Sequence, residues 1–374
     1  MKIVIAMDSF KGTLAADRAC GIVAGAIGAA LPGAEVVVKP MADGGEGTAA
    51  ALMAASEGLW IAKAVMGPRP EMEVCVGFGW LPGDRTAVVE MASASGMQLL
   101  RPEQLDPMKT TTFGTGQLIQ SALDHGAERI LLGVGGSATV DGGVGAATAL
   151  GWRFLAGDGT PVALGGASLG RICEIVPPNC GVEIPVDVLC DVDNPLCGPQ
   201  GAARVYGPQK GATPEMVETL DAALSHLAVL TAGWLGVHIR DLPGAGAAGG
   251  LAAGAVAFMD ARLVSGIETV MTRAHLRSDV ADADWVVTGE GRFDAQSMRG
   301  KVVSGVARVA REGGARVAVI AGRVELPAHL YEAAGIEAAL ACAPPGMDSR
   351  RAAERAEELL SEAATRFAAM YLGT

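Results

Sequence analysis

The chain has 374 residues, of which 50% are apolar and only 4% are aromatic. Its formal net charge of −12 argues against nucleic-acid binding, because that function needs a basic face. We predict no membrane association, since charges and turn residues interrupt every apolar stretch before it reaches spanning length. The seven cysteines form no CxxC pair, so we interpret them as reduced thiols of a cytoplasmic protein.

Strand-like and helix-like segments alternate at both ends of the chain. Residues 2–7 form a short apolar run typical of a buried parallel strand, and Thr13 can cap the helix that follows. Residues 35–41 predict a second strand, which leads into an alanine-rich helix. From residue 283 onward, strands and helices alternate again until the last helix, which begins near residue 349. This alternation predicts a parallel sheet covered on both faces.

The middle of the chain has a different pattern. Residues 74–80 and 86–92 lie close together and alternate more in polarity, as in paired strands. A helix and then a strand are predicted over residues 110–136, and a strand that ends in acids over residues 187–196. The middle therefore predicts a mixed sheet.

Together these patterns predict an α/β protein of two domains. Residues 1–64 and 281–374 are expected to form a Rossmann-like domain with a parallel sheet, built from both chain ends. Residues 65–280 are expected to form a second α/β domain with a mixed sheet, inserted into the first. No internal repeat and no low-complexity linker interrupts the sequence.

Clusters of glycine, acid and hydroxyl residues follow several predicted strands. In an open α/β sheet, ligands bind at the carboxyl ends of the strands, and glycines let backbone N–H groups approach a phosphate. Three of the seven lysines, Lys11, Lys210 and Lys301, are direct neighbours of glycines. Because Lys is a compact positive charge often used against phosphates, their placement favours a phosphate site.

These clusters also have interpretations without that chemistry. The stretch from Gly133 to Ala138 reads GxGxxA, a dinucleotide-type fingerprint, although it lies in mid-chain and does not follow the first strand. The same glycines can serve close helix packing, and acids and Thr48 can serve as helix N-caps. No Walker loop and no protein-kinase signature occurs. The residues alone therefore predict an α/β enzyme with an anion- or phosphate-binding cleft between two domains.

Acidic pairs at strand ends are candidates for proton transfer and metal binding. Phosphoryl transfer to an alcohol needs a metal on the phosphates, cationic groups, and a carboxylate that accepts the hydroxyl proton. Asp191 and Asp193 are two residues apart, so in an extended chain they point the same way. Glu290 and Asp294 lie in a second acidic loop. The alternatives are an acidic end of a strand and helix capping.

Eight stretches form an ordered series over nearly the whole chain: DSFKGTLAA, ADGGEGT, MASASGM, TTTFGTGQLI, GGSATVDGG, CDVDNPLCGPQGAARVYGPQKGA, PGAGAAGG and VVTGEGRFDAQSMRGK. The series resembles the bacterial class I glycerate kinase family. The resemblance implies Mg²⁺- and ATP-dependent phosphorylation of D-glycerate, typically to 2-phosphoglycerate. Two positions depart from the family pattern: Met7 stands where Pro precedes DSF, and Val140 stands where Asn usually precedes DGG.

With this resemblance we assign roles as hypotheses. The catalytic residues are expected to be Asp191, which accepts the proton, and the cations Lys11 and Lys210. The expected substrate-binding residues are Asp8, Ser9, Asp43, Ser93, Ser95 and Gly96. The expected ATP-binding residues are Gly135, Gly136, Ser137, Thr139, Thr288, Gly289 and Lys301. The expected Mg²⁺ ligands are Asp193, Glu290 and Asp294.

Several alternatives stay open from the sequence. A glycerate 3-kinase differs only in which of two adjacent hydroxyls is placed for attack. An NAD-linked hydroxy-acid dehydrogenase would use the GVGGSA loop, and a non-catalytic protein would bind the acid without releasing ADP. Either a monomer or a homodimer is compatible with the sequence, and the expected partners are D-glycerate and ATP.

Overall fold

A computed structural model describes residues 1–298 and 300–373 of the chain. The chain divides into two compact units. Unit 1 contains residues 1–43, 50–57 and the chain from Ile267 to the end of the described residues, and unit 2 contains residues 44–49 and 58–266.

The units differ in detail from the predicted domain limits. Residues 58–64, which we placed in the first domain, lie in unit 2, because the strand Leu59–Met66 pairs along its whole length with its hairpin partner there. Residues 267–280, which we placed in the inserted domain, lie in unit 1, where the helix Leu276–Val280 contacts the helix Val302–Glu312.

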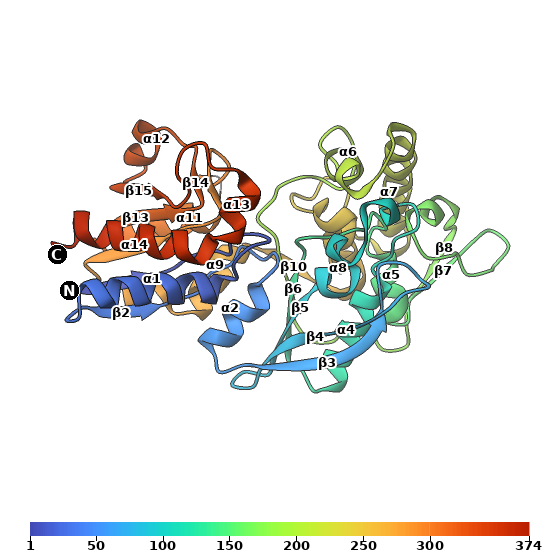
Figure 1. The fold of residues 1–374 in the computed structure, drawn as a ribbon. Coiled ribbons are helices and arrows are strands. Elements are labelled where there is room, and N and C mark those ends of the chain that lie inside the picture. Colours follow the sequence, from blue (N-terminus) through green and yellow to red (C-terminus); the bar gives the residue numbers. More distant parts are fainter. Residues whose placement is uncertain (299, 374) are drawn as a thin grey trace. The chain divides into compact units, whose positions relative to one another are not determined.

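Unit 1 is built on a five-stranded sheet with the order β15-β13-β11-β1-β2, in which every pairing is parallel (Figure 1). The strands are β1 (Lys2–Ile5), β2 (Glu35–Val38), β11 (Trp285–Thr288), β13 (Arg316–Ala321) and β15 (Ala338–Ala341). The order reverses between β1 and β11, and ligands of such sheets bind at the carboxyl ends beside this reversal, the switch point. The predicted Rossmann-like sheet from both chain ends is confirmed.

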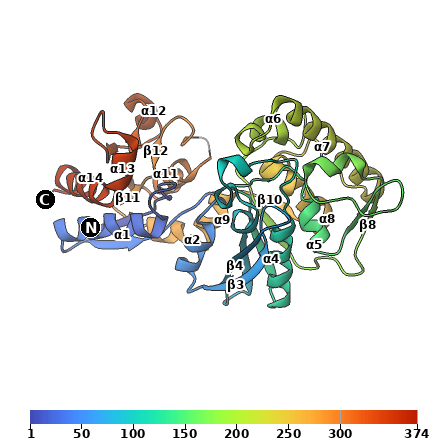
Figure 2. The ribbon, with the colours of Figure 1, turned by 45° about the vertical axis from the view of Figure 1, so that its right-hand side comes forward.

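Helices cover both faces of this sheet. Helices α1 and α14 lie side by side on one face (Figures 1 and 2), where their apolar stripes pack against Ile3, Ile5 and Val287. Helix α11 contacts β11 and β13.

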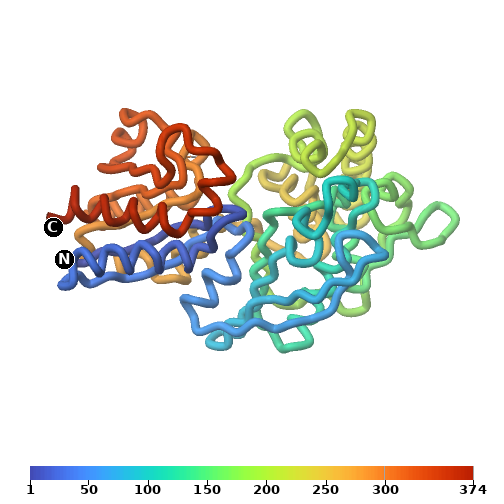
Figure 3. The backbone as a smooth tube through the Cα atoms, viewed as in Figure 1, coloured from blue at the N-terminus to red at the C-terminus, as the bar shows by residue number. Residues whose placement is uncertain are grey.

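The helices that lie wholly or mostly in unit 1 are α1 (Ala16–Ala30), α2 (Thr48–Ala55), α9 (Gly266–Arg273), α10 (Leu276–Val280), α11 (Val302–Glu312), α12 (Ala328–Ala333), α13 (Ser349–Glu354) and α14 (Ala356–Tyr371). A small separate parallel pair joins β12 (Arg292–Phe293) and β14 (Arg323–Val324). Both chain ends belong to unit 1 (Figure 3).

Unit 2 contains a six-stranded mixed sheet with the order β10-β9-β6-β5-β4-β3. The strands are β3 (Leu59–Met66), β4 (Glu73–Leu81), β5 (Thr86–Glu90), β6 (Arg129–Gly133), β9 (Val186–Leu189) and β10 (Arg262–Val264). The first three strands pair antiparallel, and the pairings from β5 to β10 are parallel. The predicted mixed sheet is therefore confirmed. A separate antiparallel pair joins β7 (Arg153–Leu155) and β8 (Glu174–Val176).

The helices of unit 2 are α3 (Met91–Ser95), α4 (Phe113–Asp124), α5 (Val144–Ala149), α6 (Ala202–Tyr206), α7 (Pro214–Leu235) and α8 (Leu251–Met259). Short 3₁₀ turns cover η1 (Met97–Leu99), η2 (Pro102–Gln104), η3 (Gly166–Arg171), η4 (Pro208–Lys210) and η5 (Ala247–Gly250). The longest helix, α7, starts where the Thr213 side chain accepts a hydrogen bond from the Met216 backbone N–H and ends at Gly236 in the left-handed conformation. Among the described residues, none of the helices combines the length and apolarity that a membrane crossing requires.

Candidate active site

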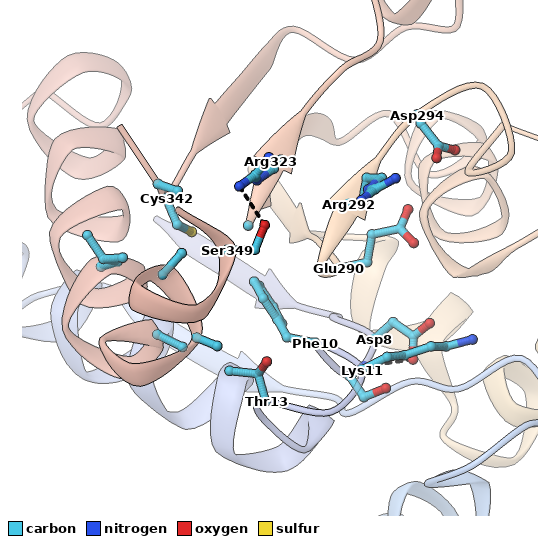
Figure 4. Close-up of a pocket in the computed structure, with 18 of the residues that line it drawn as sticks. Asp8, Phe10, Lys11, Thr13, Glu290, Arg292, Asp294, Arg323, Cys342 and Ser349 are labelled. Carbon is cyan, nitrogen blue, oxygen red and sulfur yellow. Dashed lines mark hydrogen bonds between the residues drawn. The ribbon is translucent and has the colours of Figure 1, made fainter. Parts of the chain in front are cut away.

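A cavity of about 540 Å³ lies at the carboxyl edge of the unit 1 sheet (Figure 4). Its walls come from the loops after β1, β2, β11, β13 and β15 and from the segment around α13 and the start of α14. The loops after β1 and β11 flank the switch point, where mononucleotides bind in sheets with this strand order. The volume lies within the range of ligand pockets and exceeds what a three-carbon acid fills.

One end of this cavity is strongly polar. Seven of the residues singled out from the sequence line it: Asp8, Ser9, Lys11, Asp43, Glu290, Asp294 and Lys301. They come from three separate parts of the chain, which the parallel pairing of β1 with both β2 and β11 brings to one edge. In Figure 4, Asp8, Lys11 and Glu290 gather on one side, and Cys342 lies on the other. We refer to this set of seven residues as the charged end.

The carboxyl group of Asp8 has a raised pKa. It is only 5% exposed, and burial together with the negative charge of Asp43 raises its pKa to about 7. Its Oδ1 accepts a hydrogen bond from the Ser9 backbone N–H at 2.7 Å. The Asp8 backbone N–H donates to the carbonyl of Gly289 at 2.9 Å, so the loops after β1 and β11 fix one another. Neither Gly289 nor the buried Thr288 lines the cavity, and their roles in ATP binding stay predictions.

The charged end suits a divalent cation bound together with phosphates. Burial raises the pKa of Glu290, and its buried Oε1 has no hydrogen-bond partner among the described residues. Mg²⁺ is usually held by one or two carboxylates while substrate phosphates supply further oxygens. Within residues 1–298 and 300–373, no three His, Cys, Asp or Glu side chains form a complete metal cage. Glu290 and Asp294 therefore fit such a shared site. Asp193 is exposed in unit 2, and its role as a Mg²⁺ ligand stays a prediction.

A second group of predicted residues comes together in unit 2, after β5 and β6. Gly96 and Ser137 form an isolated β-bridge, and the Ala138 N–H donates to the Ser95 carbonyl at 2.9 Å. The Ser95 hydroxyl is fully buried, 2.9 Å from the Thr115 hydroxyl, while Ser93 is half-buried on α3. The loop after β6 is thus fastened to the end of α3.

Glycine is required where the ADGGEGT segment meets this loop. A Cβ on Gly135 would lie 2.6 Å from the Cα of Gly45, and a Cβ on Gly44 would lie 2.8 Å from the Cβ of Leu189. Gly44 also has a φ of +88°, which favours glycine. These glycines thus allow close backbone approach between loops of unit 2, and the predicted role of Gly135 in ATP binding stays a prediction.

Lys210 is buried beneath the same loop. Its side chain is 1% exposed, and its Nζ donates to the Ser137 Oγ at 2.6 Å and to the Thr139 carbonyl at 2.8 Å. Burial lowers the pKa of its ammonium to about 7, against the opposing influence of the Asp141 carboxylate. Lys210 therefore holds the loop after β6 from within unit 2, and its predicted catalytic role stays a prediction.

Asp191 lies where the chain leaves unit 2. Its Oδ1 accepts hydrogen bonds from the Ser265 Oγ at 2.7 Å and from the Gly266 N–H at 3.1 Å. Gly266 is the last residue of unit 2 before the chain returns to unit 1. The Asp191 carboxylate thus holds the segment at which the chain passes from unit 2 to unit 1. Its role as proton acceptor stays a prediction.

Asp141 was missed as an individual residue, although its GGSATVDGG stretch was noted. Its buried carboxylate accepts hydrogen bonds from the Thr112 N–H at 2.8 Å and Oγ1 at 2.9 Å, and from the Gly143 N–H at 3.2 Å. An acid directly followed by two glycines was the available signal. Val140, beside it, is fully buried in the apolar core of unit 2, and Met7 is equally buried in unit 1.

Replacing Asp8 by asparagine is expected to stabilise the protein at alkaline pH. The folded state holds the Asp8 proton up to about pH 7, whereas an unfolded chain releases it near the ordinary value of 3.8. The carboxyl group therefore costs stability progressively as pH rises from about 4 to 7. At pH 8 Asp8→Asn should gain on the order of 2–4 kcal/mol in free energy of unfolding, and almost nothing near pH 4. Urea unfolding at both pH values measures this, and an equal gain at both would contradict the assignment.

Comparison with known proteins places the chain in a family. The sequence model described as "Glycerate kinase family" matches residues 3–372. The chain is 43% identical over 341 residues to the glycerate 2-kinase of Escherichia coli (strain K12), covering 90% of this chain and 89% of that protein. It is 44% identical over 374 residues to a glycerate kinase of Halalkalibacterium halodurans, covering 98% and 97%.

A solved structure supports the same grouping. The crystal structure of a protein described provisionally as glycerate kinase 2, from Salmonella typhimurium LT2, superposes with a TM-score of 0.87 at 42% identity, covering 100% of this chain and 98% of that one. The resemblance predicted from the sequence is confirmed: the chain belongs to the glycerate kinase family.

Proposed function

We propose that this protein transfers the γ-phosphoryl group of ATP to D-glycerate, on the 2-hydroxyl, and so forms 2-phosphoglycerate and ADP. The observation that carries the proposal is the charged end of the unit 1 cavity, which places two lysines and four carboxylates at a nucleotide-type switch point. The similarity to a protein named glycerate 2-kinase favours the 2-hydroxyl over the 3-hydroxyl.

In this reaction the bond between the γ-phosphorus and the ADP oxygen breaks, and a bond to the glycerate oxygen forms. The developing charge on phosphate oxygens requires cations held in place beforehand. Lys11 and Lys301 supply two such cations from the loop after β1 and from the residue preceding α11. Mg²⁺, when bound, would neutralise phosphate charge, and Glu290 and Asp294 would hold it.

The predicted residues of unit 2 keep their roles as proposals. Asp191 is the proposed acceptor of the hydroxyl proton, and Ser95 and Gly96 are the proposed donors to the glycerate carboxylate. Because the Ser95 hydroxyl is buried against the Thr115 hydroxyl, Ser95 would contribute through its backbone carbonyl, which accepts a hydrogen bond from the Ala138 N–H and so holds the loop after β6. Lys210 would hold the Gly135–Ser137 loop in the shape that binds anions.

The test is an ADP-release assay with purified protein, ATP, Mg²⁺ and D-glycerate. We expect ADP release that depends on D-glycerate and falls to background with L-glycerate. A parallel sample with NAD and no ATP should show no change in nicotinamide absorbance. NAD reduction without ADP release would replace the proposal by the dehydrogenase alternative.

A further inference from the structure

We propose that the end of the unit 1 cavity opposite to the charged end binds the adenine and ribose of the nucleotide. This inference rests on the proposed function, because it takes ATP as a substrate and asks where ATP is held. ATP would then lie along the carboxyl edge of the sheet, with its phosphates toward Lys11 and Lys301 and its base toward α13 and α14.

The lining of this end suits a flat, largely apolar ring. It consists of Phe10, Cys342, Ala343, Ala352, Ala353, Ala356 and Leu359. The four alanines present only methyl groups, so the cavity stays open between the larger Phe10 and Leu359 side chains. A purine has two apolar faces, and burying them against such walls is favourable. We refer to these seven residues as the apolar end.

Hydrogen bonds fix the orientation of polar side chains at the rim of the apolar end. The Arg323 Nη2 donates to the Ser349 Oγ at 2.9 Å and to the Met347 carbonyl at 3.0 Å, and both Arg323 and Ser349 line the cavity. Ligand pockets of this kind combine apolar walls with a few fixed polar atoms that recognise the edges of the ligand. Arg323 and Ser349 could meet the ring nitrogens or the ribose hydroxyls.

Glycerate does not match the apolar end. Each of its three carbons carries a hydroxyl or a carboxylate, so it has no apolar face to bury against alanine and phenylalanine side chains. The lining of the cavity also extends along the sheet edge. It reaches from the loop after β1 to the loop after β15, which are three strand spacings apart, or roughly 14 Å. A nucleotide matches both this length and the change from a charged to an apolar lining, whereas a three-carbon acid matches neither.

The fold also indicates toward which end of the cavity the phosphates of the nucleotide point. Lys301 directly precedes α11, a helix of 11 residues, as its N-cap, and it lines the charged end. Helix N-termini present free backbone N–H groups and a positive dipole, which favour phosphate oxygens. Together with Lys11 this places positive charge at one end of the cavity and apolar surface at the other.

The test compares Ala353→Phe with Ala369→Phe by isothermal titration calorimetry with Mg²⁺. Ala353 lines the apolar end and is exposed, so a phenylalanine there blocks the pocket without disturbing the core. Ala369 is an exposed residue near the end of α14 that does not line the cavity. We expect the Kd for ADP to rise at least tenfold in Ala353→Phe and to stay within twofold of the wild type in Ala369→Phe.

Tripolyphosphate, which carries no base or ribose, identifies which end of the cavity is affected. Its Kd should be unchanged in Ala353→Phe and should rise in Lys301→Met. Wild-type affinity of Ala353→Phe for ADP, or an equal loss for ADP and tripolyphosphate, would overturn the inference. If the wild type binds ADP but does not phosphorylate D-glycerate, only the proposed function fails. A smaller variant, Ala353→Leu, gives the same comparison if Ala353→Phe does not fold.

Discussion

Replacement of Lys11 by methionine is expected to lower kcat about 10²–10³-fold, the usual cost of removing one preorganised group that stabilises transition-state charge. Lys11 lines the charged end, close enough to Asp8 to oppose the rise of that carboxyl group's pKa. Methionine keeps most of the length of the side chain and removes only the positive charge. Steady-state kinetics with ATP and D-glycerate, followed by ADP release, give kcat and the KM of each substrate.

Lys63→Met is the matched control for this experiment. Lys63 is an exposed residue on β3 in unit 2 and lines none of the cavity described above. Its replacement should leave kcat within twofold of the wild type. A Lys11→Met protein with wild-type kcat would show that the charged end does not take part in phosphoryl transfer.

Replacement of Asp141 by alanine is expected to lower the free energy of unfolding of unit 2 by about 3–5 kcal/mol, the range seen when a buried ionic or hydrogen-bonded group loses a partner. The change removes the acceptor of two backbone N–H groups, those of Thr112 and Gly143, and of the Thr112 hydroxyl. All of these atoms are buried, so water cannot readily replace the lost carboxylate. Urea unfolding followed by circular dichroism and tryptophan fluorescence measures the loss.

Asp158→Ala is the matched control, because it distinguishes the effect of burial on the free energy of unfolding from the effect of losing any aspartate. Asp158 also accepts hydrogen bonds from a backbone N–H and a hydroxyl, both of Thr160, but it lies on an exposed turn of the same unit. Its replacement should leave the free energy of unfolding almost unchanged, as is usual for substitutions on the surface. Equal effects of the two substitutions would contradict the explanation by burial.

The parallel sheet of unit 1 was predictable because its central strands are buried on both faces. Ile3, Val4 and Ile5 form an unbroken apolar run, as do Trp285, Val286 and Val287, and such runs separated by helices are typical of parallel sheets. The charged end followed from the same reasoning, since acids and lysines directly after these strands must meet at one edge.

The apolar end was not predictable from the sequence. Its lining includes alanines of α13 and α14, and alanine is so common in this chain that no local pattern marks those which face a cavity. The position of Lys210 was likewise hidden, because a lysine beside a glycine is usually exposed. Only the packing of the η4 turn against the Ser137 loop buries its ammonium.

The domain limits depend on pairing between distant segments. Residues of β3 carry no signal that assigns them to either domain, and their place in unit 2 follows from the long hairpin with β4. Similarly, the hydrogen bonds that Asp191 accepts from Ser265 and Gly266 join positions far apart in the sequence. Spacing of acids along one strand could not reveal them.

The most direct test of the proposed activity is to identify the product. The wild-type protein is incubated with ATP, Mg²⁺ and D-glycerate, and the phosphoester is identified by ³¹P and ¹³C NMR against authentic standards. We predict 2-phosphoglycerate formed in equal amount to ADP, with phosphorus and carbon signals that match the standard whose phosphate is esterified at C2. Formation of 3-phosphoglycerate would contradict the proposed regiochemistry, and ADP release without any glycerate phosphoester would contradict the proposed activity.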